Sequence, residues 1–162
     1  MLLLENGHPV TDRWSYATEG EALGTGPVIV PLSRLSEGLG RSAGELGVML
    51  PVDESVSVLR GALPRLSLIV ITFPVFRDGR AFSQARALRE HLHFTREIRA
   101  SGHVLPDQYE FLVRCGVTTV EVPDNTDLPV WDRALHQFRV AMQPSVVNEK
   151  PTGFGLRRFL PA

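Results

Sequence analysis

The sequence is poor in cysteine and lysine, and it has no long apolar run. Cys115 is the single cysteine, so the chain can form no internal disulfide and cannot hold an iron–sulfur cluster through thiolates of its own. Lys150 is the single lysine, and the other sixteen of the seventeen basic residues are arginine. The longest apolar stretch, residues 66–73, is far shorter than the ~20 residues that a membrane helix needs.

Signals for export and for nucleic-acid binding are also missing. The first ten residues, MLLLENGHPV, lack a basic region and carry too short an apolar run for a signal peptide. The formal net charge is −1, whereas a general nucleic-acid binder carries a strong basic excess. With 162 residues, of which 43% are hydrophobic and 22% charged, the chain fits one globular domain. We therefore expect a soluble, cytoplasmic protein with no membrane or nucleic-acid partner.

Short apolar runs alternate with helical patterns along the middle of the chain. Strands are predicted at 28–32, 48–50, 66–73, 97–100 and 118–122. Helices are predicted over about 33–46, 53–64, 83–92, 106–115 and 127–142. Residues 66–73 are apolar almost throughout, which indicates a central parallel strand buried on both faces. Residues 97–100 are predicted as a short, edge-like strand.

This alternation predicts an α/β protein, in which repeated β-α units form a four- to five-stranded, mainly parallel sheet flanked by helices. An open sheet is favoured over a partial barrel. We expect a single α/β domain over residues 27–142. An irregular N-terminal segment, 1–26, precedes it, and an irregular C-terminal tail, 143–162, follows it.

Residues 72–117 contain seven arginines and five acidic residues. Ligands of open parallel sheets bind beyond the carboxyl ends of the strands, and the loop 74–82 follows the predicted central strand. Free N–H groups at the start of the next helix favour an anion there, and guanidinium groups bind sulfate, phosphate or carboxylate bidentately. The candidate anion-binding residues are therefore Arg80, Ser83, Arg86, Arg89 and Arg99.

The same residues allow a second interpretation, in which Asp78 pairs with Arg80 and Glu90 with Arg86 at the surface. Asp78 and His103 are the candidates for moving a proton. His103 precedes a predicted helix, whose positive end lowers the pKa of an imidazole, although a lone loop histidine is more often simply solvated. Phosphate-binding loops, nucleophile elbows and metal-ligand spacings are missing, so we expect no metal and no cofactor.

One segment carries a family resemblance. The stretch FPVFRDGRAFSQARALR, residues 73–89, together with the pattern that follows it to Arg114-Cys115-Gly116, resembles a family of small uncharacterised bacterial proteins encoded beside sulfite reductase genes. The resemblance is dense over residues 65–122, looser at Asp12-Arg13-Trp14, and fades after residue 142. This sequence has Arg96-Glu97 and Gly102-His103 where the family pattern has Gly-Glu and Gly-Asp. The resemblance implies a pathway, sulfite reduction in sulfate assimilation, and no catalytic residue.

Three functions are consistent with these observations. The resemblance implies an accessory protein of assimilatory sulfite reduction that binds an oxyanion, the reductase, or both. The chain is not the reductase itself, because it lacks the cysteines for a cluster and the size to hold sirohaem. A second possibility is a small α/β enzyme acting on a phosphorylated or sulfonated metabolite, with Arg80, Arg86 and Arg99 holding the anion. A third is a homodimeric scaffold without catalysis. The residues alone leave open whether the protein is an enzyme.

Overall fold

The computed structural model describes residues 1–18, 20–137, 145 and 146. Within them one sheet of eight strands has the order β2-β1-β8-β7-β6-β5-β4-β3. The strands are β1 Leu2–Glu5, β2 His8–Val10, β3 Ser15–Tyr16, β4 Val28–Pro31, β5 Leu46–Leu50, β6 Leu66–Phe73, β7 Glu97–Gly102 and β8 Thr119–Val122. The helices are η1 Leu32–Arg34, α1 Leu35–Leu39, η2 Val56–Leu59, η3 Leu63–Arg65, α2 Arg80–Glu90, η4 Pro106–Gln108, α3 Tyr109–Arg114 and α4 Leu128–Leu135.

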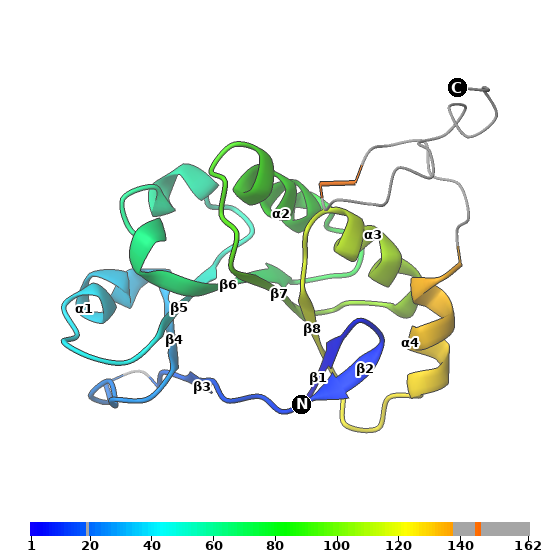
Figure 1. Ribbon diagram of the computed structural model, residues 1–162, viewed down its shortest axis with the longest axis horizontal. Coiled ribbons are helices and arrows are strands. Elements are labelled where there is room, and N and C mark those ends of the chain that lie inside the picture. The colour runs from blue at the N-terminus through cyan, green and yellow to red at the C-terminus, as the bar shows by residue number, and fades with distance from the viewer. Residues whose placement is uncertain (19, 138–144, 147–162) are drawn as a thin grey trace.

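The sheet is mixed but mostly parallel, and it curls into a half-barrel with the helices around its outside (Figure 1). Each pair of neighbours from β3 to β8 is parallel, whereas β1 runs antiparallel to both β8 and β2. The prediction of an α/β fold is confirmed, and so is the central position of β6, which lies between β5 and β7 and parallel to both.

Three expectations about the sheet are wrong. The sheet has eight strands, because residues 1–26, expected to be irregular, supply β1, β2 and β3. It is a half-barrel and not an open sheet. Residues 97–100, expected at an edge, lie in β7 between β6 and β8. The polar side chains that gave β7 the pattern of an edge strand, Glu97 and Arg99, are paired with other residues on the concave side of the half-barrel.

Two of the predicted helices are shorter than their patterns indicated. The pattern over 33–46 gives only η1 and α1, and the pattern over 53–64 gives the 3-10 helices η2 and η3. Gly38 lies within α1 and Gly40 follows it, and Pro64 lies within η3, so neither segment supports a long α-helix. The last helix, predicted over 127–142, is α4; residues 138–142 and most of the predicted tail lie outside the described residues.

The two faces of the sheet bury different sets of side chains. On the convex face, Val48, Ile71 and Ala100 belong to the main hydrophobic core beneath the helices. On the concave face, Ile29, Leu68 and Val70 form a second cluster with Trp14. Successive residues of a strand point to opposite faces, so a strand covered on both sides is apolar throughout. This explains the continuous apolar run of β6.

A short segment joins the two edges of the sheet. β2 and β3 are its outermost strands, yet only residues 11–14 connect them; we call this segment the strap. Because a chain extends at most about 3.5 Å per residue, the strap holds Val10 and Ser15 within about 18 Å of each other. The connection crosses the open side of the half-barrel (Figure 1). The curvature of the sheet and the path of the strap therefore require each other.

Trp14 fixes the strap against the apolar half of the concave face. We expect Trp14→Ala to lower the free energy of unfolding by about 3–5 kcal/mol, because it leaves a cavity over Ile29 and Leu68. Urea denaturation measures the change. Val58→Ala, at a side chain that is 48% exposed, is the control and should change the free energy little. Equal effects of the two substitutions would show that the strap does not stabilise the sheet.

Candidate functional site

The polar half of the concave face is built by β7 and β8. Glu97, Arg99 and Ser101 alternate with residues of the main core along β7, so their side chains share the concave face. On β8, Thr119 and Glu121 alternate with the core residues Val120 and Val122, so their side chains also lie on the concave face. Beside them the concave face of β4 to β6 is apolar and lies under Trp14. The concave side is thus divided into an apolar half and a polar half.

Arg99 is the centre of the polar half. Its side chain is 0% exposed, and its guanidinium forms a bidentate pair with Asp12 of the strap, with Nη1–Oδ2 of 2.7 Å and Nη2–Oδ1 of 3.0 Å. Its Nε and Nη2 donate to Glu97 Oε1 at 3.2 and 3.1 Å, and Nη1 donates to Glu121 Oε1 at 3.2 Å. Three carboxylates therefore surround one buried cation, as a buried guanidinium requires partners for its N–H groups.

Hydroxyl groups complete this network at both ends of the strands. The Tyr16 hydroxyl donates to Glu121 Oε1 at 2.5 Å, and Ser101 Oγ donates to Glu121 Oε2 at 2.6 Å. Near the other end, Thr119 Oγ1 donates to Glu97 Oε1 at 2.7 Å. Burial, and then the hydrogen bond to Glu121, raises the pKa of Tyr16 above its usual value. The phenol thus serves as a hydrogen-bond donor and not as a base at neutral pH.

The central ion pair holds both of its partners in the charged state. Burial alone would raise the pKa of Asp12, but hydrogen bonds from Arg99 and from the Trp14 N–H outweigh it and keep that pKa below its usual value. Burial likewise opposes the charge on Arg99, yet Asp12 and Glu97 raise the pKa of the guanidinium above its usual value. The strap is therefore bound to the sheet by a charged, bidentate contact.

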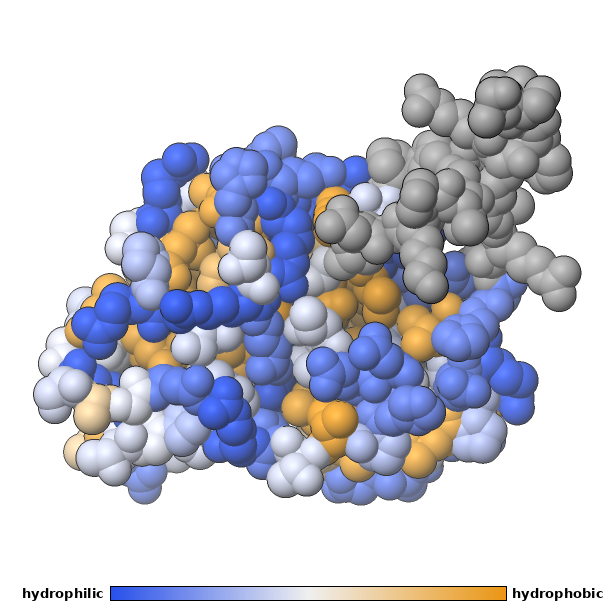
Figure 2. Space-filling view, in the orientation of Figure 1, coloured by the Kyte–Doolittle hydropathy of each residue, from blue (hydrophilic) through white to orange (hydrophobic). Residues whose placement is uncertain are grey.

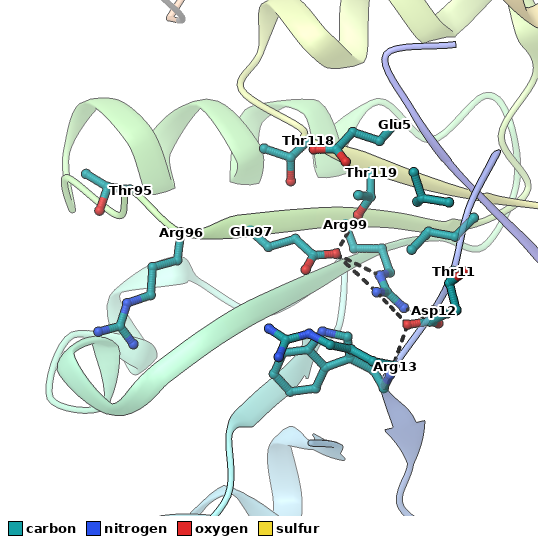
Figure 3. Close-up of a pocket in the computed structure, with 13 residues that line it drawn as sticks. Glu5, Thr11, Asp12, Arg13, Thr95, Arg96, Glu97, Arg99, Thr118 and Thr119 are labelled. Atoms are coloured by element: carbon teal, nitrogen blue, oxygen red, sulfur yellow. Dashed lines mark hydrogen bonds and ion pairs between the residues drawn. The ribbon is translucent and has the colours of Figure 1, made fainter. Parts of the chain in front are cut away.

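A cavity of about 360 Å³ lies next to this network, between the strap and the beginnings of β7 and β8 (Figure 3). Its polar wall includes Glu5, Asp12, Glu97, Arg13 and Arg96. We call it the strap cavity. It lies at the amino ends of β7 and β8, whereas the loop that leads to Arg80 and the other predicted arginines of α2 leaves the carboxyl end of β6.

Arg80 lies where the sequence predicted it, at the start of α2, and it is paired with Asp78. Its Nε lies 2.9 Å from Asp78 Oδ1 and its Nη2 lies 2.6 Å from Oδ2. The Arg80 backbone N–H also donates to Asp78 Oδ1 at 3.2 Å. These hydrogen bonds hold the pKa of Asp78 below its usual value. The Asp78 carboxylate thus occupies the Arg80 guanidinium and accepts the first backbone N–H of α2, two of the groups that an external anion would use.

The other predicted arginines are distributed over both faces of the sheet. Arg86 pairs with Glu90 at 2.7 Å. Arg89 donates to the carbonyl oxygens of Phe94, Arg96 and Gly116, which ties the end of α2 to the segments around β7 and β8. Ser83, like these two residues, is on α2 and therefore on the convex side.

Arg99 lies on the concave side, so the fold does not bring the five candidate anion-binding residues together. The alternation of Glu97, Arg99 and Ser101 with Ile98 and Ala100 is a sequence signal that could have separated Arg99 from the arginines of α2. His103, the second proton-transfer candidate, is exposed in the loop after β7, where its backbone N–H donates to the Phe73 carbonyl. For Tyr16 and Glu121 we find no signal in the sequence.

An exposed apolar surface lies at the carboxyl ends of β6 and β7. It consists of Val75, Phe76, Leu105 and Phe111, and we call it the aromatic surface. Phe76 and Phe111 are 42% and 41% exposed. In the space-filling view, hydrophobic residues reach the surface in several places between hydrophilic ones (Figure 2).

Specific contacts hold the aromatic surface in place. Gln108 Nε2 donates to the Phe76 carbonyl at 2.8 Å, and Gln108 Oε1 accepts from the Leu105 N–H at 3.0 Å, so one side chain joins both loops. The Phe82 ring lies 4.9 Å from the Phe111 ring and connects it to the core. The Arg77 guanidinium lies 5.3 Å from the centre of the Phe76 ring. Aromatic and arginine side chains are therefore presented side by side.

Comparison with known proteins places the chain in a family. A model described as "Bacterial protein of unknown function (DUF934)" matches residues 47–153, which is most of the chain, so the protein belongs to this family. No curated protein matches it. Among the described residues, no helix is long and apolar enough to cross a membrane, and no group of three His, Cys, Asp or Glu side chains could hold a metal ion.

The Arg99–Asp12 pair predicts how stability depends on pH. Because the pKa of Asp12 is lowered by folding, its contribution is present above the unfolded value of about 3.9 and is lost as the pH falls through the lower folded value. We expect Asp12→Asn to cost about 1–3 kcal/mol at neutral pH and less in acid. Urea denaturation across pH measures this, with Asp53→Asn as the control. A cost for Asp12→Asn that stays constant with pH would contradict the assignment.

Proposed function

We propose that this member of a bacterial family of unknown function is a cytoplasmic accessory protein of assimilatory sulfite reduction that docks on the reductase through the aromatic surface. The exposure of Phe76 and Phe111, held in fixed loops beside arginines, is the observation that carries the proposal. The pathway comes from the resemblance over residues 65–122, the segment that contains the whole aromatic surface. Aromatic and arginine side chains contribute most of the binding energy of many protein interfaces.

The order of the aromatic surface in the free protein favours its use in docking. Gln108 and Phe82 position the loops before any partner arrives, which lowers the entropy lost on binding. Arg77, whose guanidinium lies over the Phe76 ring, brings a positive charge to this loop, whereas the charge of Arg80 is balanced by Asp78. The charge of Arg77 favours an acidic patch on the partner.

A free oxyanion draws less support than a protein partner as the ligand of this loop. Sulfite or sulfate would have to displace Asp78, which already pairs with the Arg80 guanidinium and accepts from the Arg80 backbone N–H. The small-enzyme alternative also draws less support, because Asp78 is paired and its lowered pKa makes it a weak base. The scaffold alternative would use the same aromatic surface against a second copy of the chain, and the first experiment below distinguishes it.

The direct test is capture of the reductase. The tagged protein should retain sulfite reductase subunits from an extract of its native cell, and Phe76→Ser combined with Phe111→Ser should weaken binding to the purified reductase at least about tenfold. Val58→Ser, at a similarly exposed side chain on η2, is the control. Absence of the reductase from the captured material would contradict the proposal. Self-association abolished by the double substitution would instead support the scaffold.

The pathway is tested by growth. Deletion of the gene should slow growth on sulfate or sulfite as the sole sulfur source, and cysteine should restore it. A copy carrying Val58→Ser should complement the deletion, whereas a copy carrying Phe76→Ser and Phe111→Ser should not, provided that both variants show wild-type melting temperatures. Normal growth of the deletion strain on both sulfur sources, with no second gene copy, would remove the pathway from the proposal.

A further inference from the structure

A second apolar feature lies next to the aromatic surface, between α4 and η4. Val130 and Ala134, one turn apart on α4, face Leu105 and Pro106 across a groove of about 490 Å³. We call it the α4 groove. Asp107, Arg133 and Gln137 complete its lining. The groove therefore has an apolar floor and a polar rim.

Contacts behind the α4 groove fix its two walls against each other. The Trp131 ring of α4 lies 5.5 Å from the ring of Tyr109, which directly follows η4. The Tyr109 hydroxyl in turn accepts from the Gly7 N–H at 2.8 Å. Gln108 Oε1 accepts from the Leu105 N–H at the edge of the groove. The groove is thus formed in the free protein, which lowers the entropy lost when a partner binds.

The α4 groove continues the aromatic surface through Leu105, which belongs to both and is 38% exposed. A stable protein interface buries about 800 Å² on each partner. A fully buried aromatic side chain supplies roughly 150–250 Å². Phe76 and Phe111 are less than half exposed, so the four side chains of the aromatic surface fall well short of the area required. A partner that docks there needs the adjoining surface, and the α4 groove is its apolar part.

The rim of the α4 groove carries one charge of each sign. Asp107 and Arg133 form no side-chain hydrogen bond or ion pair with any residue that the structure describes, including each other. The arginines of α2, by contrast, are paired with carboxylates or with backbone carbonyl oxygens. Charges without a partner in the free protein are those that opposite charges on a partner complement.

Resting on the proposed docking function, we propose that the α4 groove takes an apolar side chain of sulfite reductase. The segment that carries this side chain has an acidic residue that pairs with Arg133 and a basic residue that pairs with Asp107. Apolar anchors in a groove with charged residues beside them are a common form of peptide recognition. The inference names the chemistry of the docking segment, which the aromatic surface alone does not define.

Binding to the purified reductase tests the groove. Val130→Glu places a charge on its apolar floor, and Arg133→Glu reverses the charge at its rim; each should weaken binding at least about tenfold. Arg133 is exposed and unpaired among the described residues, so this variant should fold normally. Val58→Glu and Arg60→Glu make the same two changes at exposed positions on and directly after η2, and they should bind as the wild type does.

A photo-crosslinking experiment identifies the occupant. Cys115 is only 2% exposed, so Gln137→Cys provides a single accessible thiol at the groove for a benzophenone label. Irradiation with the reductase should link the label to one reductase peptide in which an apolar residue has an acidic neighbour. The same label on Val58→Cys is the control and should not link to that peptide. No link to the reductase, or a linked peptide without an acidic residue, would overturn the inference.

The outcomes separate this inference from the docking function on which it rests. If the double substitution of Phe76 and Phe111 weakens binding while Val130→Glu and Arg133→Glu do not, the groove is empty in the complex and only the inference fails. If the wild-type protein does not bind the reductase, both fail. If Val130→Glu abolishes self-association and leaves reductase binding unchanged, a second copy of the chain fills the groove and the inference is overturned.

Discussion

The bidentate contact between Arg99 and Asp12 determines the shape of this protein. A fully buried guanidinium in the middle of a sheet needs charged acceptors. Glu97 of β7 and Glu121 of β8 supply two carboxylates, and Asp12 of the strap supplies the third. The strap has only four residues between β2 and β3, so its attachment to the centre of the concave face draws the two edges of the sheet together. Trp14, two residues after Asp12, then covers the apolar half. The Arg99–Asp12 contact and Trp14 together hold the strap across the concave side of the curved sheet, where it borders the strap cavity.

The sheet separates two kinds of chemistry because alternate residues of β7 face opposite sides. Ile98 and Ala100 pack beneath the helices, while Glu97, Arg99 and Ser101 meet the strap. The arginines of α2 thus belong to a convex surface on which Asp78 and Glu90 balance them. On the concave side, three carboxylates around one arginine leave the network negative. A single arginine-rich segment of sequence therefore produces two electrostatically different surfaces.

The sequence predicted those elements and ion pairs that depend on residues close together in the chain. The apolar run of β6 indicated a central parallel strand, and the pairs of Asp78 with Arg80 and Glu90 with Arg86 were foreseen as one of two interpretations. β1 and β2 form a hairpin around Asn6-Gly7, a turn signal that was present in the sequence but not used. β3 has only two residues and is a strand because it pairs with β4, and β1 joins the sheet through the distant β8. The half-barrel could not be predicted from local patterns, because it depends on Asp12 and Arg99, 87 positions apart. Residue alternation in β7 was a signal that was present in the sequence but not used for Arg99.

The strap cavity and the aromatic surface lie at opposite ends of the same strands. β7 has six residues, so about 20 Å separates the strap cavity at its beginning from the loops at its end. The Arg99 network covers part of this distance, from Glu97 beside the cavity to Glu121, Ser101 and Tyr16 toward the carboxyl ends. The buried cation that holds the strap thus also orders the polar side chains between the two ends of the concave face.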